Sequence, residues 1–561
     1  MCVRARACAV YRWGKDKKMS TMRVGFDKGH NDDVYALSYN PVTDHVVAVG
    51  KKFIRFFGIK EGVEDASSNS RDAKISEHES RIWAKKGVFG KGRVPGDIMC
   101  IAFAHGGTAY DGTTYVGSAE GYILRFQEQA TDLQVKAHPI GASTELCKVT
   151  ALYFDPVKHV LVSSGDDGFL RMWDPGRWAR NGDNQPLHSI NFNAWVTPEL
   201  RGIPIKMDQK ELEKANPKAG KPAAAHSLFG DGRGNLLVGT VCNEIYEVNF
   251  DHNEPPFCYM QGHYDELWAF APHPSKLEFC TGAEDETLRV WDLERRQMRA
   301  MAKIEGPIRC CCYSPDGQWI AVGLGSGGKA KNPVPPKCEG KWIVLESEDL
   351  ELKFAPPQVR HERASDMKFS PDGKFIAVGN ADNFIDLYAV PHGDGEFKRV
   401  GQLKGHSSFV IHLDWSVDSL FLQSNCGAHE LLYWRVWEPE TGALRPRQEK
   451  TSSNMRDVRW HTQSALFGWH MRGIWPEDAD GTDINACARS NTGKRQLLAT
   501  ADDFGKVKLF RYPCIVPRAD HRPYGGHSSH VTNIGFTHND HWLLSAGGDD
   551  RAVFQWEVSK E

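Results

Sequence analysis

The hydrophobic positions of this chain fall into short runs of strand length, separated by turns rich in Gly, Asp, Asn and Pro. In the clearest unit, Gly262 to Leu293, a Gly-His pair precedes three apolar runs, and the last run ends in Trp291. Residues Gly526 to Val558 repeat the same order of features. Strands recurring at roughly 40–45 residues predict the blades of a β-propeller.

Another strong copy runs from His138 to Trp173, and weaker copies are spread along the rest of the chain, near Val34, Ile98, His226, Ile308, Ala364 and Gly405. The total is about ten blades, whereas one ring normally holds four to eight. We therefore predict an all-β protein of two tandem WD-repeat propellers. Residues 1–250 would form a partial ring of about four to five blades, and 251–561 a ring of about six to seven with an insertion at 455–495.

Polar residues at fixed places in these units predict a buried hydrogen-bond relay. In a WD-repeat blade a loop His, a strand Ser or Thr, a turn Asp and a strand-end Trp satisfy one another, as burial requires. The spacing selects His263, Thr281, Asp285 and Trp291; His138, Ser163, Asp167 and Trp173; and His527, Asp550 and Trp556.

Two positions depart from the relay pattern. Ala428 stands where the turn Asp is expected, and Ala546 stands where a Ser or Thr is expected. We expect one lost hydrogen bond at each position, worth about 1 kcal/mol.

Net charge, the length of apolar runs and the spacing of cysteines limit which classes of partner and ligand the sequence predicts. The net charge of −3 gives no global basic field, so neither nucleic acid nor a membrane surface is predicted as a partner. No apolar run reaches the length of about 18 residues that a transmembrane helix needs. The 14 cysteines show neither a disulfide framework nor the CxxC spacing of a zinc site, which predicts a reduced, intracellular protein.

Two motifs resemble ligand sites but each lacks a required part. Gly323–Ala330 has the glycines and lysine of a phosphate-binding loop, but Ala330 replaces the Ser or Thr and prolines follow. A calcium loop starting at Asp478 would need Glu at its twelfth position, which is Arg489. We predict no catalytic, cofactor or metal residues and no small-molecule substrate. The candidate partner-contact residues are Trp475, Asp478, Asp480 and Asp483.

Several strings are more specific than a generic WD repeat. They are GHSSFVIHLDWSVDS from Gly405, GIWPEDADGTDINA from Gly473, ADDFGKVKLFRYPC from Ala501 and GGHSSHVTNIGFTHND from Gly525. Together with GVFGKG from Gly87 and GHYDELW from Gly262, they closely resemble the echinoderm microtubule-associated protein-like family. The resemblance covers nearly the whole chain, from about Val34 to the end.

The resemblance implies two propellers joined in tandem that bind tubulin or microtubules. In that family a coiled coil, a basic stretch and a hydrophobic motif precede the propellers, and this chain is expected to be an N-terminally shortened form. We therefore predict a non-enzymatic, cofactor-free protein of the cytoplasm and cytoskeleton, with tubulin and other cytoskeletal or axonemal proteins as partners and the ciliary axoneme as one location. The alternative is a WD-repeat scaffold or adaptor for a signalling or ubiquitin-ligase complex.

Overall fold

The computed structural model describes residues 7–12, 22–28, 33–59, 82–89, 96–107, 111–138, 147–181, 185–192, 225–231, 234–249, 256–326, 338–391, 395–438, 441, 443–476, 479–493 and 496–559. Within these ranges the protein is nearly all β-strand, with one short α-helix and two 3-10 helices: α1 (Pro175–Asn181), η2 (Ser452–Met455) and η3 (Trp469–Ile474). None of the helices described there is long and apolar enough to cross a bilayer.

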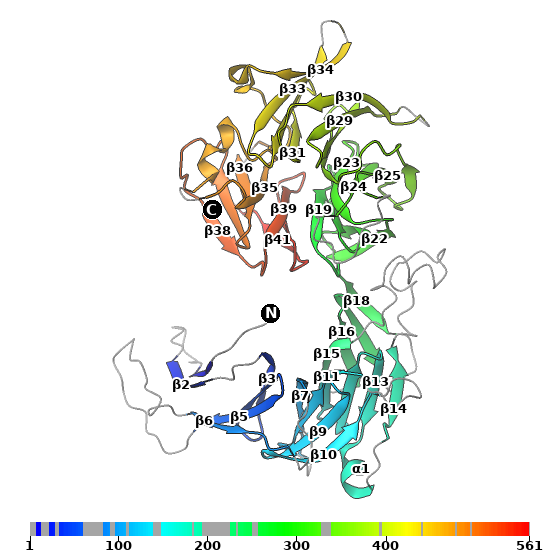
Figure 1. Cartoon of the computed structure of the whole chain (residues 1–561), viewed down its shortest axis with the longest axis vertical. Coiled ribbons are helices and arrows are strands. Elements are labelled where there is room, and N and C mark those ends of the chain that lie inside the picture. Colours follow the sequence, from blue (N-terminus) through cyan, green and yellow to red (C-terminus); the bar gives the residue numbers. More distant parts are fainter. Residues whose placement is uncertain are drawn as a thin grey trace. The chain divides into compact units, whose positions relative to one another are not determined.

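The described residues form two compact units, one that ends at Gln261 and one that begins at Gly262 (Figure 1). The first unit extends past the boundary expected at residue 250, because β18 (Phe257–Gln261) pairs with β17 (Glu244–Asn249). These residues therefore complete the last sheet of the first unit.

The described part of the first unit contains four antiparallel sheets of four strands and one sheet of two strands. The two-stranded sheet consists of β1 (Ala7–Arg12) and β2 (Met22–Lys28). The four-stranded sheets are blades in which sequence neighbours pair: β3 (Val34–Asn40), β4 (His45–Gly50), β5 (Phe53–Ile59) and β6 (Ile82–Lys86); β7 (Ile98–Phe103), β8 (Thr114–Ser118), β9 (Tyr122–Gln127) and β10 (Ala130–Lys136); β11 (Val149–Asp155), β12 (Val160–Gly165), β13 (Phe169–Trp173) and β14 (His188–Asn191); β15 (Ala225–Gly230), β16 (Asn235–Thr240), β17 and β18.

The described part of the second unit contains five blades of four strands and a last blade of three. They are β19 (Leu267–Pro272), β20 (Glu278–Ala283), β21 (Thr287–Asp292) and β22 (Gln297–Lys303); β23 (Ile308–Tyr313), β24 (Trp319–Leu324), β25 (Trp342–Glu346) and β26 (Leu352–Phe354); β27 (Ala364–Phe369), β28 (Phe375–Asn380), β29 (Phe384–Ala389) and β30 (Lys398–Lys404); β31 (Val410–Trp415), β32 (Phe421–Cys426), β33 (Leu431–Glu438) and β34 (Ala443–Glu449); β35 (Ile484–Arg489), β36 (Leu497–Asp502), β37 (Lys506–Arg511) and β38 (Arg522–Gly525); β39 (Val531–Phe536), β40 (Trp542–Gly547) and β41 (Val553–Glu557).

The first strand of every blade carries an irregularity near its start, where the pairing with the second strand shifts by one residue. It falls between Leu267 and Ala269 in β19 and between Val531 and Asn533 in β39, and the other blades repeat it. A β-bulge bends its strand and increases the local twist. The repeated bulge therefore gives each blade the same twist at its inner edge.

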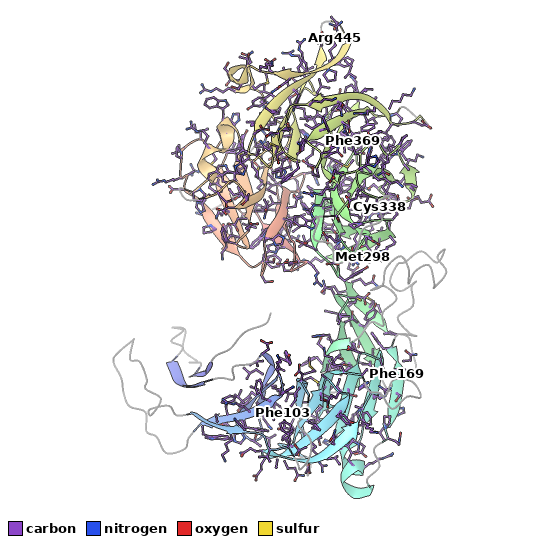
Figure 2. All side chains as sticks on the ribbon, in the orientation of Figure 1. Phe103, Phe169, Met298, Cys338, Phe369 and Arg445 are labelled. Atoms are coloured by element: carbon purple, nitrogen blue, oxygen red, sulfur yellow. The ribbon has the colours of Figure 1, made fainter. Side chains whose placement is uncertain are left out.

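Apolar side chains fill the space between neighbouring blades, as in the clusters on either side of β23. Figure 2 shows the described side chains of both units on the ribbon. Strand β23 illustrates the arrangement, because successive side chains of a strand point to opposite faces. Cys311 packs in the cluster shared with the preceding blade, whereas Cys310 and Cys312 pack in the cluster shared with the following blade. The three adjacent cysteines are thus core residues of two separate layers.

The second unit closes into a ring, and the colours in Figure 1 run round it from green through yellow to red. The backbone N–H of Leu267 in the first blade donates to the carbonyl of Gly548 in the last blade at 3.1 Å. The Thr532 hydroxyl donates to the Leu267 carbonyl at 2.9 Å. Blades that are farthest apart in this unit's sequence are therefore direct neighbours, and the fold is a WD-repeat propeller.

The insertion of the second unit runs from the end of β34 at Glu449 to the start of β35 at Ile484, so its bounds differ from the expected 455–495. Its segment 459–466, named here the wedge, lies between β31 and β35. The N–H of His461 donates to the carbonyl of Trp415 at 2.7 Å, and the N–H of Arg489 donates to that of Thr462 at 3.2 Å. The wedge thus links two blades that flank the insertion.

Candidate functional site

The relay residues of the β19–β22 blade lie in one hydrogen-bonded chain. His263 Nδ1 lies 2.9 Å from an Asp285 carboxylate oxygen, and His263 Nε2 lies 2.8 Å from the Thr281 hydroxyl. The Trp291 indole N–H donates to the same hydroxyl at 2.7 Å. All four side chains thus have partners, and the chain runs from the turn to the end of the third strand.

Two further blades repeat this geometry at the predicted residues. His138 contacts Asp167 and Ser163, each at 2.9 Å, and the Trp173 indole donates to Ser163 at 2.9 Å. In the last blade, the two ring nitrogens of His527 lie 2.9 Å from Asp550 and 2.8 Å from Ser545, while the Trp556 indole donates to Ser545 at 2.9 Å.

The last blade also shows that the hydroxyl expected at position 546 is supplied one residue earlier. Ser545 holds the place between His527 and Trp556, whereas the Ala546 side chain is buried in an apolar cluster with Leu544. The expected loss of a hydrogen bond at Ala546 was therefore wrong, because the strand register places Ser545 on the relay face.

A fourth relay has an acidic residue that the sequence pattern missed. His406 Nε2 lies 2.6 Å from the Ser424 hydroxyl, which accepts from the Trp434 indole at 2.8 Å. Glu430 takes the acidic position, with its carboxylate 3.3 Å from His406 Nδ1. The expectation that Ala428 leaves this relay without an acid was wrong, since the longer Glu side chain reaches back from a later turn position.

Ionisation in the relays follows from burial and from the partners. Burial lowers the pKa of His263, which favours the neutral ring. Burial alone would raise the pKa of Asp285, but the His263 and Arg289 partners and hydrogen bonds hold it well below its usual range. The network fits a neutral His263 that donates from Nδ1 to an ionised Asp285 and accepts at Nε2 from Thr281.

In two of the relays the order of groups is that of a Ser-His-Asp triad. A catalytic serine must reach a substrate and be activated as a nucleophile. Ser163 and Ser545 are both 0% exposed, and each hydroxyl already accepts from a tryptophan indole. The geometry therefore supports a structural role for these groups.

Charged side chains on the inner strands of the second unit also serve contacts between blades. Asp366 of β27 accepts the Leu413 N–H of β31 at 2.7 Å, and Lys368 lies 3.3 Å from Asp366. Asp414 of β31 accepts the N–H groups of Thr462 and Gln463 in the wedge at 3.0 and 2.8 Å. These groups hold neighbouring segments together.

The candidate partner-contact residues lie at the end of the insertion and differ in exposure. The Trp475 ring is half-buried and stacks on Phe467, with ring centroids 5.3 Å apart. Asp480 is exposed and accepts the Thr482 N–H at 2.8 Å, while Asp483 is half-buried. Asp478 lies outside the described residues. Of the two carboxylates of the set that the structure describes, Asp480 is the one at the surface.

The second unit also has a cavity of about 730 Å³ between its last two blades. Apolar, basic and acidic side chains line it, among them Phe510, Arg522, Tyr524, Trp556 and Glu557. A cavity of this size can hold a partner side chain or a short peptide segment.

A comparison with known families matches most of the second unit. Residues 267–558 match the model described as the echinoderm microtubule-associated protein second beta-propeller. Residues 136–174 match the WD domain, G-beta repeat. The chain belongs to the echinoderm microtubule-associated protein-like family. The match to the second-propeller model begins at the first residue of β19 and ends just after β41, so it coincides with the closed ring.

Family relatives align with nearly the whole chain. Human echinoderm microtubule-associated protein-like 3 is 33% identical over 550 residues, which cover 96% of this chain and 53% of the relative. The mouse family members 1 and 2 are 33% and 32% identical, and the alignments cover 57% and 71% of those relatives. The chain thus spans about half the length of the first two relatives.

Proposed function

We propose that this protein binds tubulin or microtubules as a non-enzymatic WD-repeat component of the cytoskeleton. The observation that carries the proposal is similarity along 96–98% of the chain to relatives named as microtubule-associated proteins. In ciliated cells we extend the proposal to the axoneme, with other axonemal proteins as additional partners.

The site geometry supports binding through the outer surface of the blades. The relay side chains are buried and paired, so the residues available to a partner are those of exposed loops and strand edges. Exposed aromatic and aliphatic side chains of the second unit include Phe504 and Val516, 69% and 64% exposed. Aromatic side chains such as that of Phe504 are enriched in protein interfaces.

Within the insertion we propose Asp480, with Asp483 and Asp478, as polar contacts beside Trp475. Asp480 is the strongest member because it is exposed on a turn that its own carboxylate stabilises. Trp475 would act mainly by holding this turn in place, since its ring already stacks on Phe467.

Co-sedimentation of the purified full chain with stabilised microtubules, together with binding to soluble tubulin, tests the proposal. We expect the protein in the pellet only when polymer is present, or in complex with soluble tubulin. Asp480→Lys is expected to change the bound fraction, and Asp349→Lys, on an exposed turn of the β23–β26 blade, is the matched control.

Absence of the protein from both the pellet and the tubulin complex would contradict direct binding. Proximity labelling in cells distinguishes the microtubule-binding proposal from the alternative, a scaffold or adaptor function. Labelling of tubulin and axonemal proteins supports the proposal, whereas labelling confined to signalling or ubiquitin-ligase subunits would support the adaptor function instead.

A further inference from the structure

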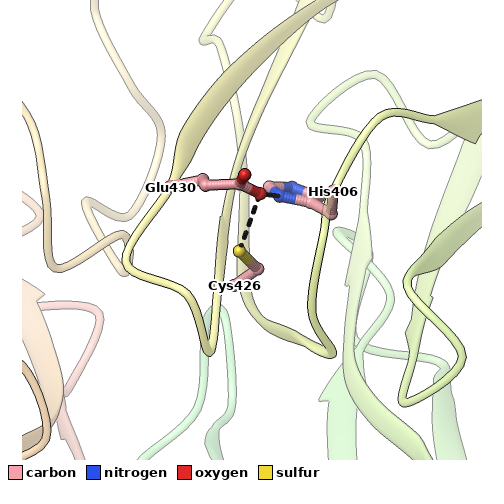
Figure 3. A group of neighbouring side chains, drawn as sticks. All are labelled: His406, Cys426 and Glu430. Atoms are coloured by element: carbon pink, nitrogen blue, oxygen red, sulfur yellow. Dashed lines mark hydrogen bonds and ion pairs between the residues drawn. The ribbon is translucent and has the colours of Figure 1, made fainter.

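The fourth relay gathers three different metal-ligating groups at one point (Figure 3). His406 Nδ1 lies 3.3 Å from Glu430 Oε2, and Cys426 Sγ lies 3.1 Å from the same oxygen. All three ligand atoms fall within 4.8 Å of one another. Cys426 is fully buried and His406 is nearly so, while Glu430 is half-buried and reaches solvent.

The position of Cys426 is defined by strand register in each relay blade. Cys426 ends β32 and pairs with Val410, the first residue of β31. The residues in the same register are Gly165, Ala283 and Gly547 in the other three relay blades. Among these four described relays, a sulfur occurs at this position in one blade only.

A side chain at this register position points at the relay histidine. A Cβ built on Gly165 would lie 2.4 Å from His138 Nδ1, and one built on Gly547 would lie 2.5 Å from His527 Nδ1. Those blades therefore require glycine. In the β31–β34 blade Cys426 takes this position, and Ala283 of the β19–β22 blade shows that a relay can also accommodate a Cβ there.

The Glu430 carboxylate is held in position by groups other than the proposed ligands. The Ser407 N–H donates to it at 2.9 Å and the Ser407 hydroxyl donates at 2.8 Å. Its Oε2 lies 3.3 Å from His406 Nδ1, near the lower end of the edges of roughly 3.3–3.8 Å in a tetrahedron of zinc bonds of about 2.0–2.3 Å, whereas its 3.1 Å distance from Cys426 Sγ must lengthen by a few tenths of an ångström on binding. In the three other relays the His–Asp distance is shorter, at 2.9 Å.

We propose that His406 Nδ1, Cys426 Sγ and the Glu430 carboxylate form a binding site for a divalent metal ion of the zinc class. Thiolate, imidazole and carboxylate are the ligands that zinc prefers, and water completes the four ligands on the exposed side of Glu430. Ser424 supports His406 through Nε2, as a second partner commonly orients a ligating histidine.

Binding involves a defined change of protonation. The Cys426 thiol loses its proton to solvent and becomes the thiolate ligand. His406 carries its ring proton on Nε2, where it is donated to the Ser424 hydroxyl, and leaves the Nδ1 lone pair for the metal. The metal would join the segment before β31, the end of β32 and the turn before β33, and so stabilise this blade.

Metal titration of the chelator-treated full chain tests the site, with Zn²⁺ and Co²⁺ as the probes. We expect the wild type to bind one more equivalent of Zn²⁺ than Cys426→Ala and to show the thiolate-to-cobalt charge-transfer band. Cys426→Ala installs the residue found at position 283, so it is expected to fold. Glu430→Gln is expected to weaken Zn²⁺ binding by about tenfold or more.

The matched control is Cys487→Ala, which removes another buried thiol of the second unit. Its sulfur contacts the carbonyls of Gln463 and Ala465. This variant is expected to keep the cobalt band and the full zinc equivalent. Equal binding by wild type and Cys426→Ala would assign the metal to other thiols and overturn the proposal. Failure of the wild type to bind either metal would overturn it as well.

Discussion

At the scale of single residues, the blades use different side chains for the same task. The residue at the end of the first strand accepts hydrogen bonds from two backbone N–H groups of the following turn. The acceptor is the side-chain oxygen of Asn40 in one blade and of Asp155 in another. In the β19–β22 blade His273 Nδ1 does this, with the N–H groups of Ser275 and Lys276 at 3.1 and 3.0 Å. A histidine here makes the turn sensitive to acid.

The pH dependence of stability is the first prediction at this scale. Burial, with a smaller effect of Lys276, lowers the pKa of His273 to about 4. An unfolded histidine titrates near about 6.5. Between these values the unfolded state binds the extra proton, so the stability contributed by His273 is complete above pH 6.5 and is lost as the pH falls toward 4.

His273→Asn introduces the residue type that Asn40 supplies at the same place in the β3–β6 blade, so the turn is expected to keep its hydrogen bonds. The free energy of unfolding, measured by denaturant titration at several pH values, should fall less steeply in this variant than in the wild type between pH 6.5 and 4. Other buried histidines leave a residual slope. An identical slope in both proteins would show that His273 does not titrate as proposed.

A second prediction concerns the relay hydroxyls. Thr281→Val removes the partner of both His263 and Trp291, and leaving buried polar groups unsatisfied costs roughly 1–3 kcal/mol. Thr281→Ser keeps the hydroxyl, as in the Ser163 and Ser545 relays, and should cost less. Urea unfolding of the two variants checks this, and equal losses would mean that the methyl group matters more than the hydrogen bonds.

At the scale of elements, the wedge shows how an insertion can become part of the ring. Asp414 of β31 is 1% exposed and receives two wedge N–H groups, and Arg489 of β35 donates to the Trp460 carbonyl at 2.8 Å. The Trp460 ring is also buried, beside Tyr433. The insertion therefore contributes a short inner segment between two blades and is more than a surface loop.

Asp414→Ala is predicted to loosen this segment. The N–H groups of Thr462 and Gln463 would lose their acceptor, at a cost of roughly 1–3 kcal/mol for each unsatisfied group. Limited proteolysis followed by mass spectrometry should then show faster cleavage between residues 450 and 483 than in the wild type. Asp349→Ala, on an exposed turn of the β23–β26 blade, should leave cleavage between residues 450 and 483 nearly unchanged. Faster cleavage there in this variant would show that the insertion opens independently of Asp414.

The blades were largely predictable from the sequence, but the wedge was not. Strands such as Leu267–Pro272 are marked by short apolar runs, by the preceding Gly-His pair and by Gly- or Asp-containing turns. The wedge carries none of these signals, because its bonds come from side chains that are far away in sequence, such as Asp414. Glu430 was missed for a related reason, since side-chain length compensated for a changed turn position.

At the scale of the whole molecule, the described four-stranded blades of the first unit pack against one another in sequence order. In the first unit the packing described between blades runs from β3 through β7 and β11 to β15. Strand β3, at one end of this series, exposes Leu37 and Tyr39 at 60% and 54%, and β15, at the other end, exposes Phe229 at 68%. Large apolar side chains thus reach solvent on both end blades.

This exposure predicts that Leu37→Ser and Phe229→Ser change the free energy of unfolding by no more than about 0.5 kcal/mol. Leu161→Ala, in the buried face of β12, should cost roughly 2–5 kcal/mol. Thermal unfolding of the three variants is the measurement. A loss of several kcal/mol in Leu37→Ser would show that a partner or another segment covers β3 in solution.

The bond that closes the second unit has a consequence for protein synthesis. Thr532 and Leu267 are 265 residues apart, and their contact joins the last blade to the first. Until the ribosome has synthesised β39, the β19 strand cannot pack against it and its inter-blade face stays uncovered. Contacts between residues so far apart in sequence form slowly, and the exposed surface favours aggregation in the meantime. Nascent chains stalled before β39 should therefore recruit chaperones that are released once translation has passed that strand.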